Sequence, residues 1–311
     1  MKMIDFDAVL CVAPKHKNLA LRAVRSLEIF SSARNIFIIT SSKNFSFFKE
    51  NILSNEKIKL LDEDLLIENI SLSYIKEYLN KRINSDIKSG WYFQQFLKMA
   101  ASNLSYISEH YLIWDSDTVL LRPLEFFDEL GRVCINPKTE NHLPYFKVLK
   151  KLLGIEKQVD YSFISEHLIV NKKYMNDLIS SIKNNSNQGN GNISWVEIIL
   201  DAIDDEDLNG SGFSEFEIYG NYIAKYFSNS FLPRPLSSIR TGTEIYGVNP
   251  NKHDLYKLMQ SGYFLVSFED WHYASPKRVA LNKLISCSSF WLTNIFDKKN
   301  KSLNYAKVIC K

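Results

Sequence analysis

The sequence predicts one large α/β domain built on a mostly parallel sheet, with a helical extension at its C-terminal end. Short apolar runs at residues 7–13, 35–40 and 57–61 have the length and composition of buried strands. Residues 18–31, between the first two runs, have helical spacing and are long enough to connect parallel strands. A further apolar run at 111–114 ends directly in acidic residues. This order of elements is typical of doubly wound, nucleotide-binding sheets related to the Rossmann fold.

Composition excludes several classes of function. The chain has 311 residues, 45% hydrophobic and 23% charged, which is ordinary for a globular protein. Its net charge of +3 is too small to indicate a nucleic-acid partner. The four cysteines lack C-x-x-C spacing, so neither a zinc site nor a redox motif is predicted. No secretory signal or long apolar run is found, so we expect a cytoplasmic protein, or one on the inner face of the membrane.

The segment that directs the functional prediction is Asp115-Ser116-Asp117, which follows the apolar run. In open α/β sheets, ligands bind beyond the carboxyl ends of the strands. Two carboxylates at i and i+2 across a turn can share a hard divalent cation, and Mg²⁺ or Mn²⁺ then keeps positions for substrate phosphates. The alternative is a pair of exposed turn aspartates without a metal. Residues 118–124 lengthen the pattern, because a short apolar stretch ends there in Arg122-Pro123-Leu124.

Residues 111–124 resemble the metal-binding segment of GT-A-fold glycosyltransferases, which reads as an apolar strand, D-x-D, a short apolar stretch and R-P-L. The resemblance implies that Asp115 and Asp117 bind Mn²⁺ or Mg²⁺, with Asp115 also near the donor. The metal in turn binds the diphosphate of a nucleotide sugar, for which a UDP-sugar is the expected donor. The implied acceptor is a saccharide or a lipid-linked saccharide, as in bacterial surface-polysaccharide synthesis by hexosyltransferase-like enzymes.

Further donor-binding residues are implied by position in that family. Gln94 and Lys98 share one face of a predicted helix at 90–100, and many GT-A enzymes place a donor-contacting helix before D-x-D. His167 lies in a strand-like run at 162–171, where the family often turns polar residues toward the donor sugar. Alternatively, the helix is amphipathic with its polar residues in solvent, and His167 is a core histidine satisfied by a backbone group.

A late histidine and two basic residues are the remaining candidates for the donor site. The run at 262–268 reads as a strand and is followed by acids, aromatics and His272. In several GT-A families a late histidine completes the metal shell and a following cation meets the diphosphate. The resemblance therefore assigns His272 to the metal and Lys277 or Arg278 to the donor. Imidazole is an acceptable ligand for Mn²⁺.

The catalytic candidates lie at a predicted helix start. Ser214 is a good N-cap, with Glu217 at the capping-box position and Glu215 in the first turn. A carboxylate presented there can act as general base toward a hydroxyl, and inverting GT-A enzymes commonly carry such a base after the metal site. We therefore take Glu215 as the catalytic base and Glu217 as the reserve. The alternative is that both residues only cap the helix.

The expected domain layout is a catalytic domain at residues 1–276, with a nucleotide-binding half at 1–122 and an acceptor half at 123–276. Residues 184–192 within it are a loop on composition. Residues 277–311 hold eight basic residues and one acid, a charge of +7, together with many aromatic and aliphatic residues. Such a helical segment can rest on an anionic membrane surface, or it can cover the sheet with its lysines in water.

Two other functions remain open. Asp115-Ser116-Asp117-Thr118-Val119 also fits the D-x-D-x-[TV] motif of haloacid-dehalogenase-type phosphatases, in which Asp115 would be the nucleophile. That family usually opens its chain with this strand and places its later acidic pair after another, whereas Asp204-Asp205 follows a helical-looking run at 195–203. A noncatalytic carbohydrate-binding protein is the third possibility.

Overall fold

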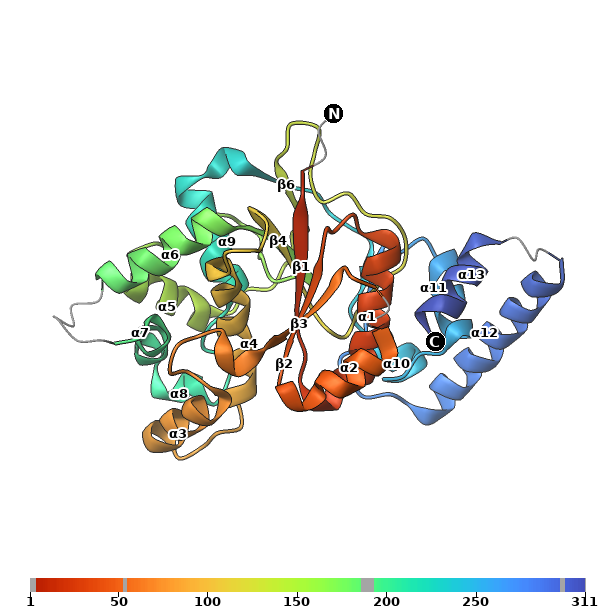
Figure 1. The fold of residues 1–311 in the computed structure, drawn as a ribbon, viewed down its shortest axis with the longest axis horizontal. Coiled ribbons are helices and arrows are strands. Elements are labelled where there is room, and N and C mark those ends of the chain that lie inside the picture. The colour runs from red at the N-terminus through yellow and green to blue at the C-terminus, as the bar shows by residue number, and fades with distance from the viewer. Residues whose placement is uncertain (1–3, 53–54, 186–192, 297–299, 311) are drawn as a thin grey trace.

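The computed structural model describes residues 4–52, 55–185, 193–296 and 300–310, and its centre is a five-stranded sheet. The strand order is β3-β2-β1-β4-β7, in which the first four strands run parallel and β7 is antiparallel to β4. This confirms the predicted mostly parallel sheet (Figure 1). The strand bounds are β1 Phe6–Cys11, β2 Ile36–Thr40, β3 Ile58–Asp62, β4 His110–Trp114 and β7 His167–Asn171.

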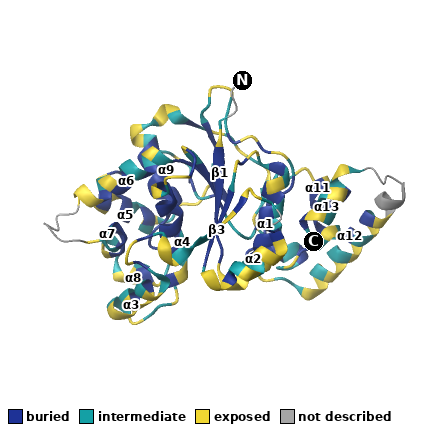
Figure 2. Cartoon of the chain, in the orientation of Figure 1, coloured by how far each residue is buried: buried dark blue, intermediate teal, exposed yellow. Residues whose placement is uncertain are grey.

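Helices cover both faces of this sheet, as Figure 1 shows for α1 and α2 on one side and for α4 on the other. All six residues of β1 are buried, which is the pattern expected of a parallel strand between two helical layers. Figure 2 shows the same concentration of buried residues in the sheet and the helix faces that contact it. The helices of this half are α1 Lys17–Phe30, α2 Phe45–Ile52, α3 Leu72–Ile83 and α4 Ser89–Ala100.

Two smaller sheets extend the second half of the chain. β10 (Leu265–Ser267) pairs antiparallel with β5 (Thr118–Leu120) and parallel with β9 (Ser238–Ile239). β6 (Val133–Ile135) pairs parallel with β8 (Phe231–Pro233) outside the central sheet. The β5–β10 pair therefore connects the turn after β4 to a segment nearly 150 residues later in the chain.

The helices of the second half pack beside β7 and α4 (Figure 1). Within α9, Gly220 lies directly against the ring of Phe163, so a side chain there would collide with the ring. The loop predicted at 184–192 lies, from residue 186 on, outside the described residues. The helix bounds are α5 Leu143–Leu153, α6 Lys172–Asn185, α7 Trp195–Ala202, α8 Asp205–Leu208 and α9 Glu215–Tyr226. In the described residues of the whole chain, short 3-10 helices form at Pro14–His16, Ser42–Asn44, Glu63–Leu65, Ala101–Asn103 and Ser228–Ser230.

The C-terminal part is a helical extension, as predicted, and it lies beyond α1 (Figure 1). α12 (Pro276–Phe296) packs on α10 (Gly242–Tyr246) and α11 (Lys252–Gln260), whereas α13 (Lys301–Ile309) packs on α11 and α1. Among the helices in the described ranges, none combines the length and apolarity that crossing a bilayer requires.

A buried carboxylate, Asp7, holds the amino ends of the central strands together. It accepts hydrogen bonds from the Arg34 guanidinium at 2.8 and 3.2 Å, from the backbone and side chain of Asn35, and from the backbone of Ser108 at 2.6 Å. Burial alone raises the pKa of this carboxyl, but these donors together lower it below its ordinary value. Asp7 thereby joins the start of β1 to the segments that lead into β2 and β4.

We expect Asp7→Asn to destabilise the protein by about 3 kcal/mol at neutral pH, because buried donors lose a charged acceptor. A lowered folded pKa contributes stability above the unfolded value of 3.8, and this contribution is lost as the pH falls. The difference between wild type and variant in urea unfolding should therefore shrink below about pH 4. Asp5→Asn, at an exposed neighbouring position, is the control. A difference that stays constant down to pH 3 would contradict this account.

Candidate active site

A cavity of about 490 Å³ lies beyond the carboxyl ends of β1 and β4. Its walls come from α4, the β4–β5 turn, the segment before β7, the start of α9, and the residues that follow β9 and β10. This is the edge of a parallel sheet at which ligands are expected. Asp115 and Asp117 line the cavity, as do Gln94 and Lys98 from α4 and Glu215 from α9.

Lys98 forms the buried centre of the site. Its ammonium nitrogen lies 3.0 Å from Asp115 Oδ1 and 2.8 Å from Glu215 Oε1, and it also stands 5.0 Å from the centre of the Phe216 ring. The residue is only 5% exposed. Burial alone lowers the pKa of this ammonium, but the two carboxylates hold it well above its usual range. Lys98 is therefore a permanent cation that connects α4, the end of β4 and α9.

Glu215 is placed by the start of α9. The Ser214 side chain accepts a hydrogen bond from the backbone N–H of Glu217, which confirms the predicted N-cap. The backbone N–H of Glu215 donates to Gln95 Oε1 at 3.1 Å, so α4 also fixes the first turn of α9. These contacts hold the Glu215 carboxylate at the cavity wall, paired with Lys98.

Asp117 lies in an environment with excess negative charge. Its burial, together with the charges of Asp115 and Glu269, raises the pKa of its carboxyl to about 7. Its backbone carbonyl accepts a hydrogen bond from Phe268 at 2.9 Å, and the hydroxyls of Thr118 and Ser267 are 2.7 Å apart. The β5–β10 pair thus brings Glu269 into the neighbourhood of the β4–β5 turn.

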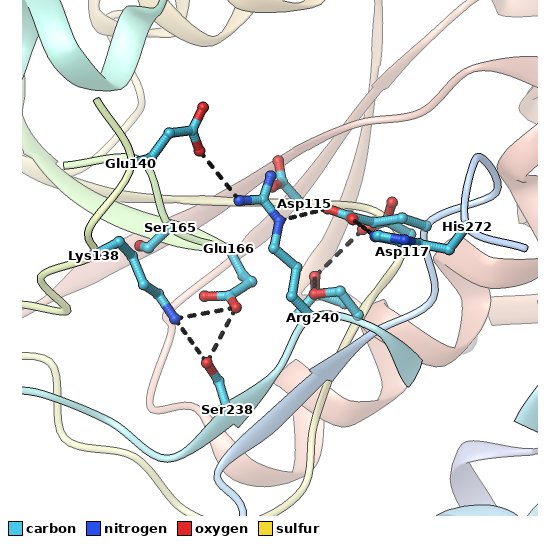
Figure 3. A network of polar contacts seen from close by, with 12 residues as sticks. Asp115, Asp117, Lys138, Glu140, Ser165, Glu166, Ser238, Arg240 and His272 are labelled. Carbon is cyan, nitrogen blue, oxygen red and sulfur yellow. Dashed lines mark hydrogen bonds and ion pairs between the residues drawn. The ribbon is translucent and has the colours of Figure 1, made fainter. Parts of the chain in front are cut away.

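Arg240, just after β9, is a cavity cation that the sequence analysis did not select. Its Nε donates to Glu269 Oε1 at 2.9 Å, and its Nη1 lies 3.5 Å from Glu140 Oε2. Burial alone lowers the pKa of the guanidinium, but Glu269, Glu140 and Asp115 raise it above its usual range. Figure 3 shows the guanidinium beside Asp115, with Glu140 on one side of the view and His272 on the other.

A second polar group lies to the lower left of the Arg240 guanidinium in Figure 3. Glu166 Oε1 accepts hydrogen bonds from Lys138 at 3.4 Å and from Ser238 at 3.1 Å, while Lys138 also donates to Ser238. The backbone carbonyl of Glu166 accepts from Asp115 N–H at 3.2 Å. This group ties the segment before β7 to the β4–β5 turn and supports the wall of the cavity.

Two predicted residues, His167 and Glu217, are buried away from the cavity. His167 packs against Trp114 and Phe126, and burial lowers its pKa to about 4, so it is a neutral core histidine. The ring is buried as the core alternative expects, but among the described residues its Nδ1 has no hydrogen-bond partner, so the backbone contact of that alternative is not found. Both carboxylate oxygens of Glu217 are engaged, one by Ser162 and the backbone of Phe163 and the other by Asn221. Glu217 therefore neither completes a capping box nor reaches the cavity.

The three residues predicted near the C-terminal end for the metal and the donor, His272, Lys277 and Arg278, also lie outside the cavity lining. Lys277 and Arg278 are exposed in the first turn of α12, since the helix starts at Pro276 and turns them to solvent. His272 Nε2 lies 2.7 Å from Glu269 Oε2, and its Nδ1 lies 3.4 Å from Glu244 Oε1. The His272 ring is thus held by two glutamates, next to the cavity residue Trp271.

Asp115 and Asp117 have the oxygen ligands and the excess negative charge that suit Mg²⁺ or Mn²⁺. In the described part of the chain, however, three potential ligand atoms converge only at Asp204, Glu206 and Asp207. Lys147 and Lys151 pair with that group, which lies at the start of α8 rather than at the cavity. His272 would have to move to join Asp115 and Asp117 at a shared metal.

The phosphatase alternative requires a second acidic pair after a strand. Asp204 and Asp205 instead follow the helix α7.

Residues 19–232 match a protein family described as a family of unknown function, DUF6492. The chain belongs to this family. The matched residues include Lys98, Asp115, Asp117 and Glu215, whereas Arg240, Glu269 and His272 follow them. A comparison with curated proteins found no match.

Several solved structures are similar to this chain at low sequence identity. The apo form of mouse xyloside xylosyltransferase 1 is 11% identical, with a TM-score of 0.44, over 85% of this chain and 97% of that one. The galactosyltransferase LgtC, in complex with donor and acceptor sugar analogues, is 11% identical with a TM-score of 0.43, over 91% and 95%. The glycosyltransferase GlyE of Streptococcus pneumoniae TIGR4 is 13% identical with a TM-score of 0.41, over 95% and 64%.

We expect Lys98→Met to lower the free energy of unfolding by about 3–5 kcal/mol, because it leaves two carboxylates facing each other without a cation. The matched control is Lys81→Met, which removes an exposed i,i+4 pair with Glu77 and should change little. Urea unfolding at neutral pH measures both. Comparable losses in the two variants would show that the Lys98 cluster does not contribute specially to stability.

The raised pKa of Asp117 predicts a stability that falls with rising pH. The folded protein keeps this proton up to about pH 7, whereas an unfolded aspartate releases it near 3.8. Ionisation therefore destabilises the fold progressively between these values, and fully above them. In buffer with a metal chelator, Asp117→Asn should be more stable than wild type at pH 8, and the gap should narrow toward pH 5. Parallel pH profiles for the two proteins would refute the shift.

Proposed function

We propose that this protein is a metal-dependent glycosyltransferase that moves a sugar from a nucleotide-sugar donor, with a UDP-sugar expected, to a saccharide or lipid-linked saccharide. The observation that carries the proposal is the pair Asp115 and Asp117 at the carboxyl edge of the sheet, lining a cavity together with Arg240. Carboxylates for a divalent cation and a guanidinium for phosphate oxygens are what a sugar diphosphate requires. The cavity volume of about 490 Å³ is in the range of small-molecule sites.

Asp115 and Asp117 are the residues that would hold the metal, which would neutralise part of the diphosphate charge. Asp115 already shares Lys98, so Asp117 is the better candidate for the direct ligand. His272 stays a predicted third ligand. It would have to exchange its contacts with Glu269 and Glu244 for the metal.

Arg240 is the cation best placed for the leaving diphosphate. Negative charge grows on that group as the glycosidic bond breaks, so a fixed cation beside it stabilises the transition state. Lys98 is fully engaged by two carboxylates, and Lys277 and Arg278 do not line the cavity. Arg240 instead contacts Glu269 and Glu140 through Nε and Nη1, which leaves Nη2 for phosphate oxygens.

Glu215 is the general base in this proposal, for a transfer with inversion. Direct displacement requires a carboxylate near the acceptor hydroxyl, and Glu215 is the catalytic candidate that lines the cavity. Lys98 holds one of its oxygens at 2.8 Å, which fixes the orientation of the carboxylate. The surface-polysaccharide role and the hexosyl donor are further parts of the proposal that rest on the family resemblance alone.

The proposal is tested by incubating the protein with Mn²⁺ and a panel of sugar nucleotides, since water can serve as acceptor and release the nucleotide. Asp117→Asn should lose metal-dependent donor binding in calorimetry. Arg240→Gln should weaken binding of the nucleoside diphosphate, whereas Arg278→Gln, the matched arginine outside the cavity, should not. If wild type binds no nucleotide sugar in the presence of Mn²⁺ or of Mg²⁺, the proposed function is wrong.

We expect Glu215→Gln to reduce turnover by about two to four orders of magnitude with nearly unchanged donor affinity. Glu217→Gln is the control, because Glu217 makes only internal contacts, and we expect it to affect stability more than turnover. NMR of the product identifies its anomer. Near-normal turnover in Glu215→Gln, or a product that keeps the anomeric configuration of the donor, would remove Glu215 from the role of base.

A further inference from the structure

The outer side of α12 is apolar and exposed. Leu281, Leu284, Ile285 and Trp291 are 59%, 67%, 48% and 52% exposed. Their spacing of three, one and six residues places them along one side of the helix. The opposite side is buried, since Phe290 packs 4.6 Å from His253 and 5.7 Å from Tyr256 of α11, measured between ring centres. Up to Trp291, α12 is therefore covered on the side that faces α11, while the side that carries the four apolar residues is exposed (Figure 2).

The apolar surface extends into the loop that precedes α12. Trp271 and Tyr273 are 68% and 79% exposed, although both are large aromatic residues. Trp271 also lines the cavity described above. We call these six residues, Trp271 and Tyr273 with the four of α12, the α12 surface. Trp271 links this set of residues to the cavity, because it also lines the cavity.

Cations accompany this apolar surface. Lys277 and Arg278 are exposed in the first turn of α12, between Tyr273 and Leu281. Residues 277–311 carry a charge of +7 by sequence. Apolar residues with tryptophan and tyrosine, next to exposed lysine and arginine, are typical of helices that lie in the interface of an anionic bilayer.

We propose that the α12 surface binds anionic lipid membranes, with α12 lying in the plane of the interface. A second copy of this chain fits the surface less well, because a twofold contact would bring the two basic segments together. The aromatic side chains suit the headgroup level, where one end of the ring is apolar and the other wet.

This inference gives the proposed function a location for its acceptor. Since Trp271 belongs to both the α12 surface and the cavity wall, a protein bound through this surface would bring one wall of its cavity to the bilayer. A lipid-linked saccharide could then reach the cavity without leaving its membrane. That step rests on the proposed function, whereas membrane binding itself does not.

The test is co-sedimentation of the full chain with vesicles of phosphatidylcholine and phosphatidylglycerol at 7:3, and with phosphatidylcholine alone. Wild type should bind the anionic vesicles at least tenfold more tightly, and 0.5 M NaCl should weaken this binding. Leu284→Ser/Trp291→Ser should bind at least tenfold more weakly than wild type. The matched control is Leu65→Ser/Ile87→Ser, which replaces residues 83% and 84% exposed outside the α12 surface and should bind normally.

Equal binding by the Leu284→Ser/Trp291→Ser variant and wild type, or no binding of wild type to anionic vesicles, would overturn the proposal. Analytical ultracentrifugation tests whether a second copy of this chain binds the α12 surface. A wild-type dimer that these substitutions dissociate would make the surface a self-association site instead of a membrane site. Because no donor or turnover enters these measurements, they can fail while nucleotide-sugar binding succeeds, and the reverse also holds. Circular dichroism confirms that each variant is folded.

Discussion

The buried ammonium of Lys98, held between Asp115 and Glu215, is the interaction on which the rest of the site depends. It joins three elements that are far apart in the sequence, and it allows the partly exposed Asp115 and the buried Glu215 to lie in one wall of the cavity. A buried ion pair of this kind contributes little net stability compared with an apolar packing, but it is sensitive to the loss of either partner. The main effect of this ion pair is to hold the end of β4 and the start of α9 in a fixed position relative to α4.

The charges of the cavity are unequal in number. Its lining holds five carboxylates, those of Asp115, Asp117, Glu140, Glu215 and Glu269, against three fixed cations, those of Lys88, Lys98 and Arg240. Burial first, and then the negative charges of Asp115 and Glu269, raise the pKa of Asp117, whereas Asp115 and Glu215 hold the pKa of Lys98 high. A divalent cation at the two aspartates would reduce this imbalance, and Arg240 lies beside Asp115 (Figure 3), so an anion bound there would meet two sources of positive charge.

Local patterns in the sequence were sufficient for much of this arrangement. The strands around β1 and β4, the helix carrying Lys98 and the Ser214 cap all follow from periodicity or short-range capping, so residues at their ends could be placed at one sheet edge. Arg240 could not be found in this way, because β9 has only two residues and its partner β10 is remote in the chain. His167 and Glu217 were misleading for a related reason. The sequence does not reveal whether a polar residue in a strand or a first turn of a helix faces the core or a cavity. Here His167 packs against Trp114, and Glu217 accepts a hydrogen bond from Asn221, so both face the core.

The contact of Gly220 with the Phe163 ring has a consequence for how this family can diverge. α9 approaches the segment before β7 so closely that a Cβ at position 220 has no room beside that ring. Any ancestor or descendant that acquired a larger residue at 220 would have had to lose the ring at 163, or to shift α9 and with it Glu215. The two positions should therefore co-vary across homologous sequences, with glycine retained wherever 163 is aromatic, even though neither residue touches the cavity.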